Sequence, residues 1–123
     1  MGFTITSTYN TLDLSGSDAT YDATAHGVGG LLYIKYTKGN ETGVTISFSY
    51  KARGLAASDR YSHMSLNAST RIMTPTTYIL NASGSYRIPF TWTAEETAVK
   101  FTFTQYGVTT ATGTIDVDFR EAE

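Results

Sequence analysis

The chain has 123 residues, a formal net charge of −2, only 16% charged residues and no cysteine. Its length predicts one domain, the missing cysteines exclude disulfides and thiolate metal sites, and the lack of a basic stripe argues against a nucleic-acid partner. Residues 1–6 carry neither a basic start nor a long apolar run, so we expect no signal peptide and no membrane as a partner.

The N-terminal part of the chain is polar and weakly patterned. Residues 3–6 alternate apolar and hydroxyl side chains and predict a short strand, and residues 19–25 predict another. A polar stretch lies between them, and residues 26–30 form a glycine-rich break. We interpret residues 1–18 as an N-terminal arm and residues 19–123 as a single β-sandwich domain.

The clearest pattern runs from residue 31 to residue 51. An apolar run at 31–36 leads into a polar, glycine-containing link at 37–43, and a strictly alternating segment follows at 44–51. A period of two is typical of a strand with one buried face. Two such strands joined by a polar link predict a β-hairpin. The apolar face of the second strand carries Val44, Ile46, Phe48 and Tyr50.

The second half of the chain alternates in the same way. Short strands are predicted at 61–66 and 77–80, and longer ones at 86–92, 99–104 and 114–120. With the earlier segments this makes roughly seven to nine strands, which predicts an all-β fold, an antiparallel β-sandwich that we expect to be jelly-roll-like. The side chains expected to form the core are Leu32, Ile34, Val44, Ile46, Phe48, Ile88, Phe90, Val99, Phe101, Phe103, Ile115, Val117 and Phe119.

Two prolines and one capping motif mark where strands end. Pro75 is expected to end or edge the strand before it. Pro89 has no N–H to donate and therefore predicts an edge strand. Thr93, followed three residues later by Glu96, has the form of a capping box and predicts one short helical turn between two strands.

Metal and cofactor sites are not expected. His26 and His63 have no second ligand at a metal-binding spacing. Asp13, Asp18 and Asp22 lie in a polar segment, and three loop carboxylates can bind Ca²⁺. Their spacing matches no calcium loop, however, and aspartate is also a common turn residue, so we favour the turn interpretation.

No catalytic set is recognisable, so we expect that the chain is not an enzyme. Asp116 and Asp118 are two residues apart, and paired carboxylates can cleave glycosides, but we favour a solvated outer strand face for both. No serine occupies a nucleophile elbow. Trp92 and the many tyrosines could form a sugar-binding platform, although the phase of its strand predicts that Trp92 belongs to the core.

The loops are the candidates for a binding surface, because binding residues are often carried by loops on a rigid scaffold. We consider residues 1–18 and the connection from 53 to 63 as the two best segments. The alternative is a disordered tail and an ordinary solvated loop. Arginine and tyrosine are enriched at interface centres, and the candidate interface residues are Arg53, Arg60, Tyr61 and His63.

Residues 32–42 and the alternating strand after them, together with 86–90, 93–97 and 113–119, resemble a pattern in small tailed-phage virion proteins. The resemblance implies a β-sandwich or jelly roll that decorates a capsid as a cement protein, located in the virion that is assembled in the host cytoplasm. The implied partners are the major capsid protein or other virion proteins, with homo-oligomer or lattice neighbours. The alternatives are a tail or neck component and a carbohydrate-binding module. No functional residue is carried over, since the class has no shared site to match.

Overall fold

The computed structural model describes residues 3–5, 10–16, 18–24, 29–52, 61–62, 64–91 and 96–122. All regular structure within these ranges is β-structure, in twelve strands. They are β1 (Phe3–Ile5), β2 (Asn10–Asp13), β3 (Ala19–Thr24), β4 (Gly29–Thr37), β5 (Gly43–Ala52), β6 (Tyr61–Ser62), β7 (Met64–Asn67), β8 (Ile72–Pro75), β9 (Thr77–Leu80), β10 (Gly84–Thr91), β11 (Glu96–Tyr106) and β12 (Thr114–Ala122).

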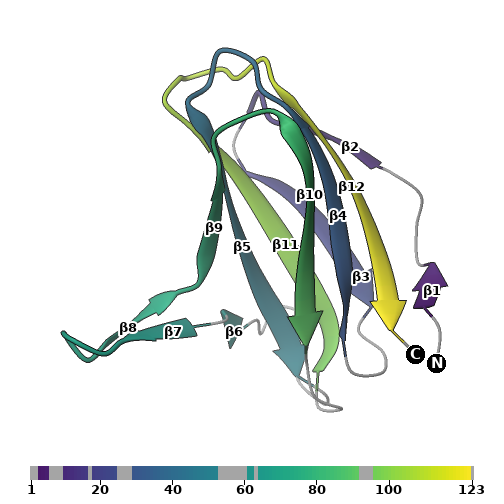
Figure 1. Ribbon diagram of the computed structural model, residues 1–123, viewed down its shortest axis with the longest axis vertical. Coiled ribbons are helices and arrows are strands. Elements are labelled where there is room, and N and C mark those ends of the chain that lie inside the picture. The colour runs from purple at the N-terminus through teal and green to yellow at the C-terminus, as the bar shows by residue number, and fades with distance from the viewer. Residues whose placement is uncertain are drawn as a thin grey trace.

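Two five-stranded antiparallel sheets lie face to face (Figure 1). Sheet A has the order β1-β12-β4-β10, and β2 pairs with another part of β12. Sheet B has the order β3-β11-β5-β6, and β9 pairs with another part of β5. A separate two-stranded sheet, β7-β8, projects from the side of the sandwich. The antiparallel β-sandwich predicted from the sequence is thereby confirmed.

The strand pairings are nested. β2 pairs with β12, β3 with β11, β4 with β10 and β5 with β9, so the first half of the chain pairs with the second half in reverse order. The pairings β12-β4 and β11-β5 then join these ribbons into the two sheets. The jelly-roll arrangement stays a prediction, which this nested order supports because a jelly roll winds eight strands into two such sheets.

The predicted β-hairpin of residues 31–51 is wrong in its pairing. Both strands form, but β4 lies in sheet A and β5 in sheet B, and the link between them crosses from one sheet to the other. The apolar faces of β4 and β5 both point into the space between the sheets. Alternation shows which face of a strand is buried. It is equally compatible with two strands that pair in one sheet and with two strands that face each other across the core.

Side chains from both sheets fill the core. Phe101 of β11 and Phe119 of β12 meet across the sandwich with ring centroids 5.6 Å apart. Of the predicted core residues, Ile88 is only partly buried, because it lies on the edge strand β10, and the side chain of Phe90 lies outside those described. The other eleven predicted core residues are buried, and Leu14, Tyr36, Leu80 and Ala111 join them.

The remaining sequence predictions have mixed outcomes. β8 ends at Pro75, and Pro89 lies on β10, which pairs only with β4 among the described strands, as the proline pattern predicted. In the segment 1–18 the described strands pair with β12, and the interpretation as an arm stays a prediction. The predicted helical turn falls on 93–95, outside the described residues, and Glu96 begins β11.

Candidate functional site

The interface residues predicted from sequence are not brought together by the described structure. Arg53, Arg60 and His63 lie outside the described residues. Tyr61 opens β6, where its backbone pairs with Tyr50 of β5, and its side chain is not among those described. This surface therefore stays a prediction.

A different surface stands out in the structure. Within the described part of the chain, every large apolar side chain that is exposed falls in the segment from Met64 to Ile79. Exposed apolar patches mark interaction sites more often than scattered apolar residues do. The exposed fractions are Met64 38%, Leu66 59%, Ile72 57%, Met73 52%, Tyr78 38% and Ile79 61%.

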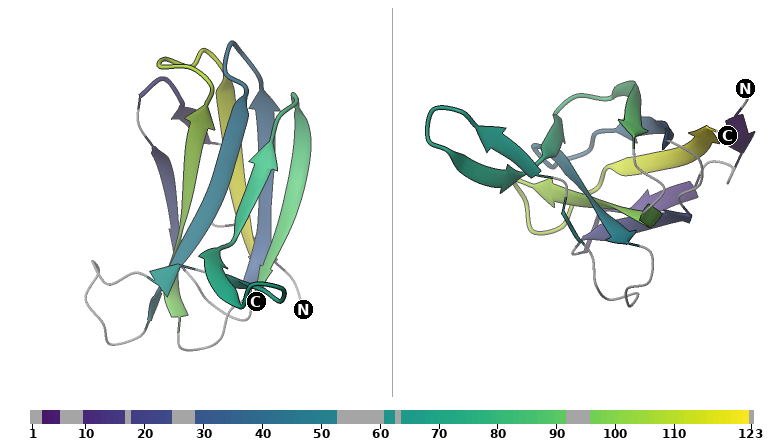
Figure 2. Two further views of the ribbon diagram at one scale, coloured as in Figure 1. Left: turned by 90° about the vertical axis from the view of Figure 1, so that its left-hand side faces the viewer. Right: turned by 90° about the horizontal axis from the view of Figure 1, so that it is seen from below.

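Most of this segment is the β7–β8 hairpin, which extends away from the sandwich (Figure 2). Met64 is opposite Pro75, and Leu66 is opposite Met73. Side chains alternate between the two faces of a strand, so Met64, Leu66 and Met73 share one face, while Ile72 lies on the other. The hairpin thus presents apolar side chains on both faces.

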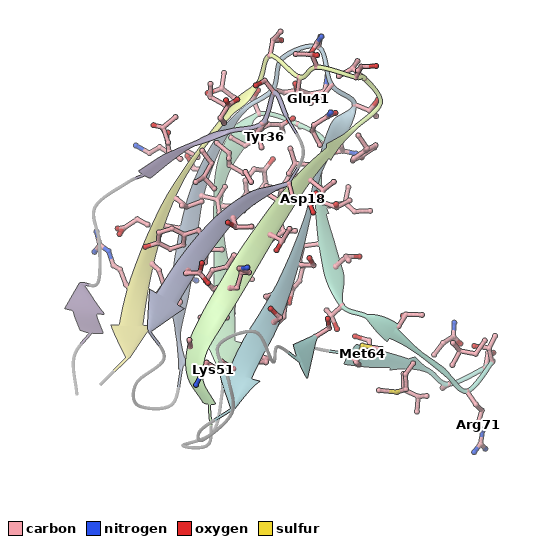
Figure 3. All side chains as sticks on the ribbon, turned by 180° about the vertical axis from the view of Figure 1, so that it is seen from behind. Asp18, Tyr36, Glu41, Lys51, Met64 and Arg71 are labelled. Carbon is pink, nitrogen blue, oxygen red and sulfur yellow. The ribbon has the colours of Figure 1, made fainter. Side chains whose placement is uncertain are left out.

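The tip of the hairpin is held by its own hydrogen bonds. The side-chain oxygen of Asn67 accepts from the backbone N–H groups of Ser69 and Thr70 at 3.0 and 3.2 Å, and its carbonyl accepts from Arg71 N–H at 2.7 Å. Arg71 has φ of +60°, the left-handed conformation that closes such turns. Figure 3 shows Arg71 at the tip, far from the sandwich. The turn at the tip is therefore closed by local residues alone.

The base of the hairpin is anchored to the sandwich. Ser65 and Thr76 share a hydrogen bond through their hydroxyl groups. After Thr76 the chain enters β9, where the ring of Tyr78 stacks on Phe48 with centroids 6.1 Å apart. Ile79 is opposite Thr45, on the outer face of sheet B. These contacts position the apolar hairpin relative to a rigid core.

The hairpin and β9 are nearly free of charge. Arg71 is the only charged residue between residues 64 and 80. A partner surface for this segment therefore needs apolar area and few charged groups. This depletion of charge is typical of the centre of a protein–protein interface.

The opposite end of the sandwich contains a buried carboxylate, that of Glu41 (Figure 3). It accepts hydrogen bonds from the Tyr36 hydroxyl, from Gly39 N–H at 2.9 Å and from Gly113 N–H at 2.9 Å. Burial alone would raise the pKa of Glu41, but these hydrogen bonds lower it to about 2. Burial, followed by the hydrogen bond to Glu41, raises the pKa of Tyr36. The network ties the β4–β5 link to the start of β12, which is a structural role.

Of the three loop carboxylates considered from sequence, Asp22 lies in β3 and not in a turn, whereas Asp13 and Asp18 accept hydrogen bonds within the chain. Asp13 accepts from Ser15 N–H at 2.9 Å, which supports the turn interpretation, and Asp18 accepts from the Thr104 hydroxyl at 2.7 Å. In the segments that the structure describes, no group of three or more potential ligand side chains could hold a metal ion.

The predicted solvated face for Asp116 and Asp118 is wrong for Asp118. The Asp118 side chain is buried and accepts a hydrogen bond from Arg120 Nε at 3.1 Å. The Arg120 guanidinium lies 5.3 Å from the centroid of the Tyr33 ring. Asp116 accepts from the Thr11 hydroxyl at 2.6 Å. The arginine two residues along the strand compensates the buried charge of Asp118.

Two further candidates cannot be placed. His26 and Trp92 both lie outside the described residues, so the metal and sugar-platform alternatives gain no support from geometry.

No helix in the described ranges is long and apolar enough to cross a membrane. Comparisons with protein-family models, with curated proteins and with solved structures found no match to this chain.

Sequence reasoning missed the hairpin surface, although a signal for it exists. Ile72 and Met73 are adjacent in a strand, so their side chains point to opposite faces, and a strand with one buried face cannot bury both. Asn67 begins a turn, and four residues separate it from Ile72. Two short strands joined by such a turn form the pattern of a hairpin.

Proposed function

We propose that this protein is a structural virion protein of a tailed phage that binds an assembled capsid and stabilises it as a decoration protein. One observation carries the proposal: the exposed large apolar side chains of the described residues are concentrated in the single projecting segment 64–79. Such a patch, the only one of large apolar side chains on the described surface, favours a protein whose work is to contact other proteins. The sequence resemblance to small tailed-phage virion proteins gives the class of partner, the major capsid protein.

The chemistry of the described carboxylates is consistent with a binding role. The side chains of Asp13, Glu41, Asp116 and Asp118 each accept a hydrogen bond from a neighbouring group of the same chain. The nested strand order supports a jelly roll, an architecture found in viral capsid and lectin domains. Because one architecture can host many functions, the apolar hairpin carries more weight than the strand order.

Stabilisation of the shell would follow from mass action. A protein that binds the assembled shell but not its separated subunits stabilises the assembly by about 2.7 kcal/mol per site when its free concentration is 100 times its Kd. On a symmetric lattice, neighbouring contacts act together, so weak contacts at each site give strong attachment overall.

The proposal is tested on particles of a phage that carries the gene. Heads and tails are separated, and the chain is quantified by mass spectrometry against the major capsid protein. We expect a fixed stoichiometry in the head fraction. We also expect that shells assembled without the chain disassemble at a lower temperature and regain stability when the purified protein is added. Presence in tails alone would contradict decoration and favour a tail or neck component, and absence from particles would contradict a virion function.

A further inference from the structure

The β7–β8 hairpin has the features of an interface that is incomplete in the single chain. An isolated two-stranded hairpin is marginally stable in water, and this one extends away from the core with apolar side chains on both faces. Leu66 and Met73 lie on one face, and Ile72 on the other. A partner that covers the hairpin must therefore contact both of its faces.

The exposed apolar area fits the size of a protein dimer interface. Taking about 150 Å², the lower end of the range for aromatic side chains, for a fully exposed aliphatic side chain, the side chains of Met64, Leu66, Ile72, Met73 and Ile79 together expose on the order of 400 Å². Apolar atoms make up just over half of a typical interface, so the whole contact would cover roughly 700 Å² on each side. Specific interfaces bury about 800 Å² per partner.

The charge distribution favours a second copy of this chain as the occupant. The segment from 64 to 80 carries one charged residue, Arg71, at the hairpin tip. When two hairpins run antiparallel across a two-fold axis, each tip lies near the base of the other hairpin, so the two Arg71 side chains are at opposite ends of the contact. Two copies therefore match apolar surface with apolar surface without juxtaposing like charges.

We propose that two copies of this chain form a two-fold dimer by exchanging their β7–β8 hairpins, each hairpin lying between the partner's hairpin and the partner's sandwich. The contact is isologous, which means that both copies use the same surface, so each apolar residue of the hairpin contributes to the interface twice. The pairing does not rest on the proposed function, and within the dimer the hairpins are covered by the partner chain rather than by the shell.

The first test is sedimentation equilibrium of the full chain from about 1 to 200 μM, which reaches the weak, micromolar end of the affinities of such interfaces. We expect a mass of twice 13.4 kDa at the upper concentrations. The double change Leu66→Glu and Met73→Glu should raise the dimer Kd at least about 100-fold, because four carboxylates would be buried in apolar contacts. Thr109→Glu is the matched control, because Thr109 is exposed in the β11–β12 loop at the other end of the sandwich, and it should leave the Kd unchanged.

The second test uses the absence of cysteine from the chain. A short bifunctional maleimide should cross-link Met73→Cys into dimers and leave Thr109→Cys monomeric. The substituted side chains are exposed in the single chain, so the circular dichroism of every variant should match the parent, as should its thermal melt at concentrations where the parent is monomeric.

The outcomes separate this inference from the proposed function. A parent chain that is monomeric at 200 μM would overturn the dimer and leave another protein as the occupant of the hairpin. A trimer or larger assembly would contradict the two-fold exchange. A dimer unaffected by the double change would show that the hairpin does not form the dimer interface. A monomer that is still found in virions would contradict the dimer while the virion function stands.

Discussion

Replacing Glu41 by Gln tests the account of the buried network at the end of the sandwich. The carboxylate accepts from the Tyr36 hydroxyl, Gly39 N–H and Gly113 N–H, and its side chain is 0% exposed. An amide has only one acceptor oxygen. The Tyr36 hydroxyl can reverse its bond, but either amide orientation places NH₂ against one of the two backbone N–H groups. The substitution leaves one buried N–H donor unsatisfied and weakens the charge-assisted hydrogen bonds. Together these effects should lower the free energy of unfolding by roughly 2–4 kcal/mol.

The pH dependence of the free energy of unfolding gives a second measure of the stability that the Glu41 carboxylate contributes. The pKa of Glu41 is lowered to about 2 in the folded chain from an ordinary value of 4.5, a difference of roughly 3 kcal/mol. A lowered carboxyl pKa stabilises the fold above the unfolded pKa, and this contribution is lost as the pH falls from 4.5 towards 2. The stability difference between the parent and Glu41→Gln should therefore be largest at pH 7 and shrink below pH 4.5.

Urea denaturation followed by circular dichroism at pH 7 and at pH 3 measures both effects. Asp13→Asn is the control, because Asp13 is exposed and an asparagine oxygen can still accept from Ser15 N–H, so it should change the free energy of unfolding by less than about 0.5 kcal/mol. A loss below 1 kcal/mol at pH 7 for Glu41→Gln, or a loss that is the same at both pH values, would refute the reasoning.

Three further substitutions probe the core, the Glu41 network and the hairpin. Phe101→Ala should lower the free energy of unfolding by about 3–5 kcal/mol, since the ring is fully buried, and an unchanged thermal melt would contradict the core assignment. Gly113→Ala should cost about 1–3 kcal/mol, because the new methyl group would overlap the Glu41 carboxylate, whereas Gly16→Ala meets open space, and equal stability of the two variants would contradict this close packing. Asn67→Ala should speed amide exchange in β7 and β8 about fivefold by removing the turn's acceptor, and unaltered exchange would show that the tip is held in another way.

The faces of the strands could be predicted from sequence, but their partners could not. The alternation of Val44, Ile46 and Phe48 indicates correctly that this face of β5 is buried. It contains no information on whether β5 pairs with β4 or faces it across the core, because both arrangements bury the same side chains. The neighbours of β5 are the nearby β6 and, far along the chain, β9 and β11, so the pairing is set by tertiary packing.

The burial of the polar residues could not be predicted from the alternation of the strands. Glu41 lies in a polar link that is typical of a solvated turn, and its burial is made possible by Gly113, 72 residues away. Asp118 alternates with core residues and is typical of an outer face, yet its carboxylate is buried against Arg120. The exposed hairpin could not be predicted for the opposite reason: Leu66 and Met73 resemble core residues in the sequence, but neither described sheet of the sandwich covers them.

Methionine oxidation of purified virions tests most directly the claim that the hairpin is a protein-binding surface. Two of the three methionines of the chain, Met64 and Met73, lie on the hairpin and are exposed in the single chain. Each is quantified as its sulfoxide by mass spectrometry, in virions and in chain diluted to monomer. The account predicts that both oxidise at least about fivefold more slowly in virions, because burial limits access of the oxidant to the sulfur. Equal oxidation rates in virions and in the free monomer would contradict it.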